Sequence, residues 1–148
     1  MGTLPLNTSA FLGSGVTAEL APSSATTYAG VIAGSGGVAK NGSGDATISG
    51  GNSFTGTLAV NSGTLFAAPS TSNPGISGVI GDRASVVVAC GATLDISGRS
   101  ETVGSLAGAG SVQLGQNGEL VAGRNNSGTV FSGSLLGSAS SPWPKQAM

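Results

Sequence analysis

Short runs of alternating apolar and small polar residues, each bounded by glycine, asparagine or serine, recur along most of this chain. Thr57–Asn61 and Ala92–Ile96 are two examples. A period of two with turn residues at both ends predicts short β-strands. Glycine accounts for 27 of the 148 residues, and each glycine inside a helix costs roughly 1 kcal/mol relative to alanine. The pattern therefore argues against helices and predicts an all-β fold.

Several of these runs recur further along the chain. Val60–Leu65 resembles Val88–Leu94, with one additional residue in the second copy. The pattern of Ile32–Val38, apolar-x-Gly-x-Gly-x-apolar, returns in Leu106–Val112, and a weaker copy starts at Leu135. Approximate repetition every 20–30 residues is typical of a solenoid.

Stacked coils would let each short strand pair with the strands above and below it, which a strand of this length needs for stability. Glycine and asparagine would supply the corners with positive φ. A thin interior would also explain why only 4% of the residues are aromatic. With about 22 residues per coil, roughly six or seven coils would form a rod about 30 Å long. The expected inward-facing residues are Ile32, Val38, Ile48, Leu58, Val60, Leu65, Val86, Val88, Leu94, Ile96, Leu106, Val112, Leu114 and Leu120.

Three segments are expected along the chain. Residues 1–25 would form an irregular N-terminal segment or a capping coil, 26–137 the β-helix repeats, and 138–148 a disordered tail. Within the repeats, Pro69–Gly75 breaks strand pairing and predicts a protruding loop.

The composition restricts the chemistry that this chain could perform. Charged residues make up 7% of it and the net charge is −1, so no basic patch would hold a phosphate backbone and nucleic acid is not an expected partner. Histidine is absent and Cys90 is the one cysteine, which removes the usual general base, an intrachain disulfide and a cysteine metal cluster. We expect no catalytic, metal-binding or cofactor-binding residue, and no cofactor.

Each remaining candidate has a simpler structural interpretation. The carboxylates are spread singly and are interpreted as solvated turn residues, with Asp82-Arg83 as a surface turn. Gly42–Asp45 matches only part of a calcium-binding nonapeptide, in one copy. Cys90 is interpreted as a small residue at a coil corner, and Lys40 as an exposed charge that discourages sideways strand pairing. The carboxylates considered are Glu19, Asp45, Asp82, Asp95, Glu101 and Glu119.

The repeat unit resembles a known family, the autotransporter-associated β-strand repeat. Its steps are an apolar-x-Lys step, here ending at Lys40, then Gly-x-Asn-x-aromatic-x-Gly with Phe54 as the aromatic residue, then apolar-x-x-Gly-x-Leu. The resemblance covers roughly residues 26–137. The segments that carry it are Gly30–Gly44, Ile48–Gly56, Val60–Leu65, Gly91–Gly110 and Asn125–Gly133.

This resemblance implies a right-handed parallel β-helix from the passenger region of a type V secreted protein of Gram-negative bacteria. We expect a non-catalytic, adhesive stalk segment at the cell surface or outside the cell, with exposed loops that contact host or cell-surface ligands. The alternatives are a carbohydrate-active β-helix enzyme fragment and a truncated, non-functional remnant.

Two features of a complete family member are not recognisable in this sequence. The N-terminus has no secretory signal pattern, and the C-terminal outer-membrane translocator barrel of the family is not seen. We therefore expect a passenger fragment of a longer parent protein, with a tendency to self-associate through its open coil ends.

Overall fold

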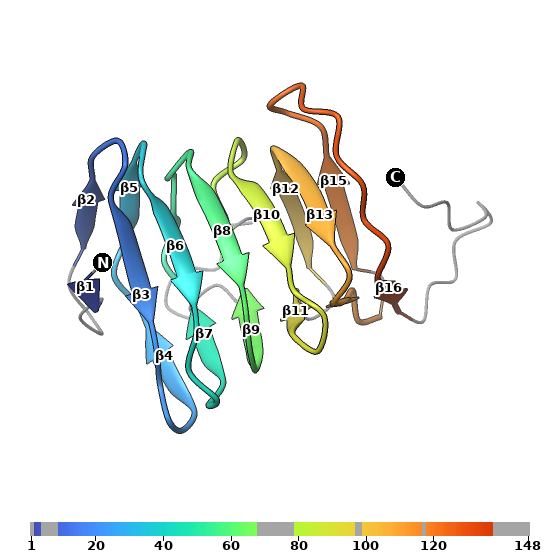
Figure 1. Cartoon of the computed structure of the whole chain (residues 1–148), viewed down its shortest axis with the longest axis horizontal. Helices are drawn as coiled ribbons and strands as arrows, with labels where there is room; N and C mark the ends of the chain where they lie inside the picture. Colours follow the sequence, from blue (N-terminus) through green and yellow to red (C-terminus); the bar gives the residue numbers. More distant parts are fainter. Residues whose placement is uncertain (1, 4–8, 68–78, 97–98, 117, 138–148) are drawn as a thin grey trace.

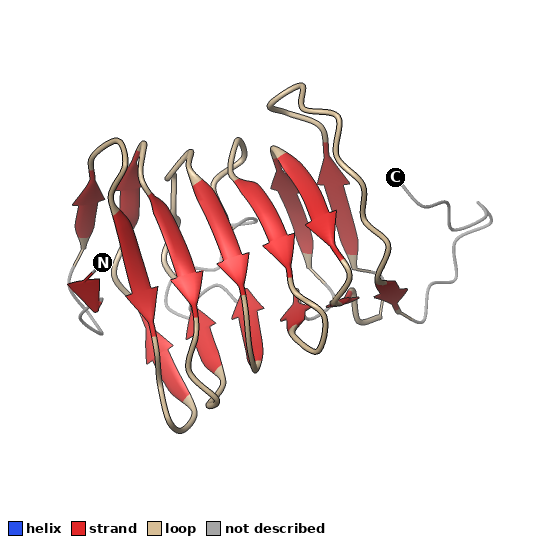
Figure 2. Ribbon diagram, viewed as in Figure 1, coloured by secondary structure: helices blue, strands red, loops and turns tan. Residues whose placement is uncertain are grey.

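The chain winds into a β-solenoid in the computed structural model (Figure 1). The structure describes residues 2–3, 9–67, 79–96, 99–116 and 118–137. In that part of the chain the regular elements are all strands, without a helix (Figure 2), and every strand pair is parallel. Each coil, here called a rung, passes through three faces before it stacks on the next.

The first face is a six-stranded parallel sheet, and the second face is another. In both, strands that are neighbours in the sheet belong to successive rungs. The first face contains β1 (Gly2–Thr3), β3 (Thr17–Leu20), β6 (Gly37–Lys40), β8 (Thr57–Val60), β10 (Ser85–Val88) and β13 (Ser105–Gly108). The second face contains β4 (Thr26–Tyr28), β7 (Ala46–Ile48), β9 (Thr64–Ala67), β11 (Thr93–Asp95), β14 (Ser111–Gln113) and β16 (Ser134–Leu136).

The third face is interrupted. It consists of two separate strand pairs, β2 (Ala10–Leu12) with β5 (Ile32–Gly34), and β12 (Ser100–Val103) with β15 (Glu119–Ala122). Between these pairs the chain passes through residues 50–56 and 79–84 without forming strands. Side chains hold the rungs together at this interruption.

The register fixes the length of each rung. Ala18 pairs with Val38 and Val38 with Leu58, so two successive rungs have the same, shorter length. Val60 pairs with Val88, and the rung between them is longer because it contains residues 68–78, which lie outside the described part. The solenoid has about six turns, which confirms the predicted fold class. The short and long rungs bracket the coil length that the sequence predicts.

The two sequence repeats have different structural meanings. The similarity of Val60–Leu65 to Val88–Leu94 marks a true rung, because Val60 stacks on Val88 and Leu65 on Leu94. The other repeat relates two corners on different faces: Ile32 begins β5 on the third face, whereas Leu106 lies in β13 on the first. The second repeat therefore marks two similar corners and does not identify residues that stack on each other.

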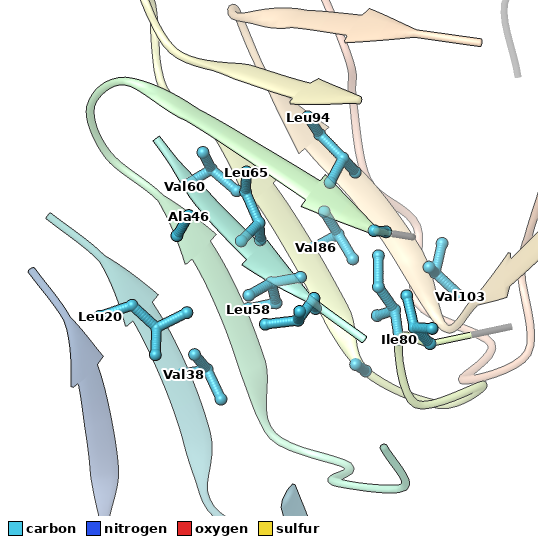
Figure 3. Packing of buried hydrophobic residues seen from close by; sticks show 14 of the residues in the cluster. Leu20, Val38, Ala46, Leu58, Val60, Leu65, Ile80, Val86, Leu94 and Val103 are labelled. Carbon is cyan, nitrogen blue, oxygen red and sulfur yellow. The ribbon is translucent and has the colours of Figure 1, made fainter. Parts of the chain in front are cut away.

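The interior is a single apolar column between the faces (Figure 3). The predicted inward residues are buried, except that Leu114 and Leu120, near the C-terminal end of the described part, are only partly buried. Residues 10–20 contain β2 and β3, which pair with β5 and β6 and extend the column. The expected loop at 69–75 and the tail at 138–148 lie outside the described residues. Buried residues that the sequence did not single out include Leu12, Leu20, Tyr28, Phe54, Ile80 and Val103.

Candidate functional site

Lys40 is buried, so the expectation of an exposed charge was wrong. It ends β6 and has no solvent-exposed surface. It lies in an inward-facing row of stacked residues, with Leu20, Val60 and Val88 at the same position on other rungs. The reason is the period of two, because side chains alternate along a strand and Lys40 shares a side with the buried Val38.

Backbone carbonyls satisfy the buried ammonium group. Lys40 Nζ donates to the carbonyl oxygen of Gly42 in its own rung, and to that of Ser62 in the next rung at 2.9 Å. Burial lowers the pKa of Lys40, and the negative charge of Asp45 opposes that change. Lys40 therefore ties two consecutive corners together.

Glu101 is also buried, which corrects its interpretation as a solvated turn residue. It lies in β12 with 3% of its surface exposed. Its carboxylate accepts hydrogen bonds from the backbone N–H groups of Val79 at 3.0 Å and Ile80 at 2.9 Å. Burial raises the pKa of Glu101 to about 7, and the charge of Asp82 adds to the rise, while the two backbone hydrogen bonds oppose it.

Asn52 and Glu101 hold Val79 from opposite sides of its rung. The Asn52 side chain accepts from the Ile32 N–H at 2.7 Å and donates to the Val79 carbonyl at 2.6 Å. The Glu101 carboxylate accepts a hydrogen bond from the Val79 N–H. Asn52 and Val79 lie where the third face lacks strands and Glu101 lies in β12 beside that gap, so the two side chains replace part of the missing backbone ladder. Asn52 is the asparagine of the Gly-x-Asn-x-aromatic-x-Gly step, and this bridging role was not predicted.

Polar side chains at two other corners form hydrogen-bonded ladders along the solenoid. Asn41 donates to Glu19 at 2.6 Å, and Asn61 donates to Asn41 at 2.8 Å. On another edge, Asn125 donates to the hydroxyls of Ser85 at 2.9 Å and Ser105 at 3.2 Å. Each of these ladders joins groups on successive rungs, so the ladders stabilise the stack.

A shallow surface depression of ≈ 390 Å³ lies beside the interrupted third face. The side chains that line it are polar or charged, and Asn52 is the buried one among them. Asp82 and Arg83 form an exposed turn, as predicted. No sequence signal indicated that Arg124, which is distant along the chain, would join them. The lining residues are Asn52, Ser53, Thr55, Asp82, Arg83 and Arg124.

The other candidate residues are dispersed. Asp45 is exposed and accepts a hydrogen bond from the Thr64 N–H at 3.2 Å. Asp95 is half-buried in β11, and Glu119 is exposed at the start of β15. Cys90 is exposed in the turn between β10 and β11, as its interpretation as a corner residue predicted.

Side chains able to bind a metal ion are dispersed among the residues that the structure describes. Within those residues, no three His, Cys, Asp or Glu side chains gather closely enough to hold a metal ion. The same part of the chain contains no apolar helix of membrane-spanning length.

Stacked parallel rungs around one apolar column define the chain as a β-solenoid repeat protein. Over 116 residues, 75% of its length, it is 34% identical to the adhesin BmaC autotransporter of Brucella suis biovar 1 (strain 1330). The match covers 3% of that relative, so the chain spans a small part of its length. No family model and no solved structure matches the chain. The similarity and the solenoid together confirm the resemblance to an autotransporter passenger fragment.

Proposed function

We propose that this chain is a non-catalytic, adhesive passenger segment that acts as a stiff stalk at the bacterial surface. The observation that carries the proposal is the continuous parallel stacking of the first and second faces. Each rung is hydrogen-bonded to both neighbours, so bending the rod would break several backbone hydrogen bonds at once. The similarity to an autotransporter adhesin supports placing such a rod outside the cell.

The side-chain ladders add to this stiffness. Lys40, Asn52 and Glu101 each bond to residues in neighbouring rungs. Such bonds act at the corners and at the interrupted face, where the sheets alone would be weakest. The stalk would therefore resist shear between rungs along its whole described length.

The surroundings of Glu101 favour this function over a carbohydrate-active enzyme. A glycosidase needs an acid and a base that both reach the substrate. The Glu101 carboxyl has the raised pKa of a general acid, but it is buried and both of its oxygens accept backbone N–H groups. It is therefore turned toward the backbone that it supports.

Force spectroscopy on the full chain, held at its two ends, tests the stalk. We expect discrete unfolding events, with up to about 65 Å of contour length released for each of the shorter rungs. Smooth extension at low force, as for a flexible polymer, would overturn the proposal.

The adhesive part has its own test. Beads coated with the folded chain should attach several-fold more often to bacterial lawns or epithelial matrix than beads coated with the denatured chain. Equal attachment of both kinds of bead would mean that the chain is a spacer without adhesive function. Time-dependent cleavage of a polysaccharide that Glu101→Gln abolishes would instead favour the enzyme.

A further inference from the structure

The depression beside the third face gathers polar side chains that differ from those of the ladder corners in one respect. At the ladder corners, polar side chains such as Asn61 and Asn125 bond to side chains on neighbouring rungs. In the depression, the side chains of Ser53, Thr55, Asp82, Arg83 and Arg124 have no hydrogen bond or ion pair to other described residues. Five polar groups thus face one hollow without a partner in the described chain.

The hollow follows the axis of the solenoid. Backbone N–H groups donate from one rung to the carbonyl of the rung before: Ser85 to Gly56, Gly104 to Ala84, and Asn125 to Gly104. Thr55 directly precedes Gly56, Arg83 directly precedes Ala84, and Arg124 directly precedes Asn125. The two arginines are therefore two rungs apart, about 10 Å along the axis. Gly104 lies between them in the stack, and an added Cβ there would overlap the Arg83 carbonyl oxygen and the Asn125 side-chain amide, so the backbones of these rungs lie close together.

The charge of the hollow is unusual for this chain. The described cations are Lys40, Arg83, Arg99 and Arg124, and Lys40 is buried. Two of the three exposed cations thus line one hollow. With one carboxylate, Asp82, the lining carries a formal charge of +1, whereas the whole chain carries −1. Guanidinium groups bind carboxylate and sulfate oxygens through paired hydrogen bonds.

We propose that this depression binds an acidic saccharide. The guanidinium groups of Arg83 and Arg124 would hold its carboxylate or sulfate groups, the Asp82 carboxylate would accept from sugar hydroxyls, and Ser53 and Thr55 would bond to the remaining hydroxyls. The lining has no apolar side chain, which disfavours a peptide, since peptide grooves supply apolar pockets or a free strand edge. This inference rests on the proposed adhesive function and names the class of ligand.

Binding of defined oligosaccharides to the full chain tests the site, measured by isothermal titration calorimetry at low salt. The probes are an oligogalacturonate for the carboxylate, a heparin-derived oligosaccharide for the sulfate, neutral dextran and poly-glutamate. We expect binding to one or both acidic saccharides and none to dextran. The preferred probe identifies the anionic group.

Two variants and one control establish the location of the site. Arg83→Gln and Arg124→Gln should each weaken binding roughly tenfold, the loss expected for one charge-assisted hydrogen bond. Arg99→Gln removes an exposed cation outside the depression and should leave the affinity unchanged. Thermal unfolding of each variant should match that of the parent chain, because these side chains are exposed.

Several outcomes would overturn the site. They are no binding to either acidic saccharide, equal binding to dextran, tighter binding to poly-glutamate, or an equal loss in Arg99→Gln. If any of these occurs while the chain still unfolds stepwise under force and the coated beads still attach, the ligand assignment fails and the adhesive stalk stands.

Discussion

The Nζ atom of Lys40 lies 2.9 Å from the carbonyl oxygen of Ser62, one rung further along the solenoid. A lysine thus occupies a stacked row that also contains the apolar residues Leu20, Val60 and Val88. Its aliphatic stem fills the apolar column, while its ammonium group reaches the corner carbonyls. One residue thereby packs the core and cross-links two rungs.

Replacing Lys40 with methionine should destabilise the chain by about 2 kcal/mol. The substitution keeps the volume but leaves the carbonyls of Gly42 and Ser62 without their lysine donor, at about 1.5 kcal/mol for each charge-assisted hydrogen bond. Removing a buried charge partly offsets the loss. Urea unfolding measures the difference. Arg99→Met is the control, and it should change stability by less than about 0.5 kcal/mol because Arg99 is exposed. A Lys40→Met chain as stable as the parent would contradict this role.

The buried carboxyl of Glu101 should make the stability of the chain depend on pH. Its pKa is about 7 in the folded chain against an ordinary 4.5, so the folded chain holds this proton over a range in which the unfolded chain has released it. Stability therefore falls as pH rises from about 4.5 to 7, by about 3 kcal/mol in total. The chain has no histidine, the side chain that ordinarily titrates in this range.

Urea unfolding at pH 5 and pH 8 measures this effect. Glu101→Gln should abolish most of the difference between the two pH values, because glutamine does not titrate. Glu119→Gln is the matched control, since Glu119 is exposed on the neighbouring strand β15, and it should keep the parental pH dependence. A parent chain that is equally stable at both values would show that Glu101 is already ionised at pH 5.

The fold was accessible from the sequence because its two main signals are local. Alternation in Thr57–Val60 and Ser85–Val88 identifies strands, and the similarity of Val60–Leu65 to Val88–Leu94 identifies the stacking partner directly. The same alternation places Lys40 beside Val38 on the inner side. The expectation failed there because the charge of the residue was given more weight than its position in the strand.

The depression and the Asn52–Val79–Glu101 contacts were not accessible in this way. Asn52 and Glu101 are far apart in the sequence and contact the same residue, Val79, because the solenoid places each of them one rung away from it. Arg83 and Arg124 come together because each rung returns the chain to the same corner. Such proximity depends on the exact rung length, which one sequence with an irregular repeat does not define.

Adjacent valines in β10 offer a direct test of which side faces the core. Val86 is fully buried and Val87 is half-buried on the outer side. Val86→Ala should cost about 2–3 kcal/mol through lost burial and a residual cavity, and Val87→Ala less than about 1 kcal/mol. Urea unfolding of both variants measures the costs. Equal costs would mean that β10 is not held in the described register.

Two glycine corners should respond very differently to alanine, although both have positive φ. Gly91 has φ +86 with open space around an added Cβ, whereas Gly108 has φ +107 and its Cβ would overlap the carbonyl oxygen of Val88 in the rung before. Gly91→Ala should therefore cost only the backbone strain, about 1 kcal/mol. Gly108→Ala should cost several kcal/mol, because β10 and β13 would have to separate at this corner. Thermal unfolding compares the stability of the two variants. The N–H of Gly110 donates to the Val88 carbonyl, and its hydrogen exchange should become faster in Gly108→Ala alone. Equal loss in both variants would show that φ, rather than the close approach of the two rungs, requires glycine at Gly108.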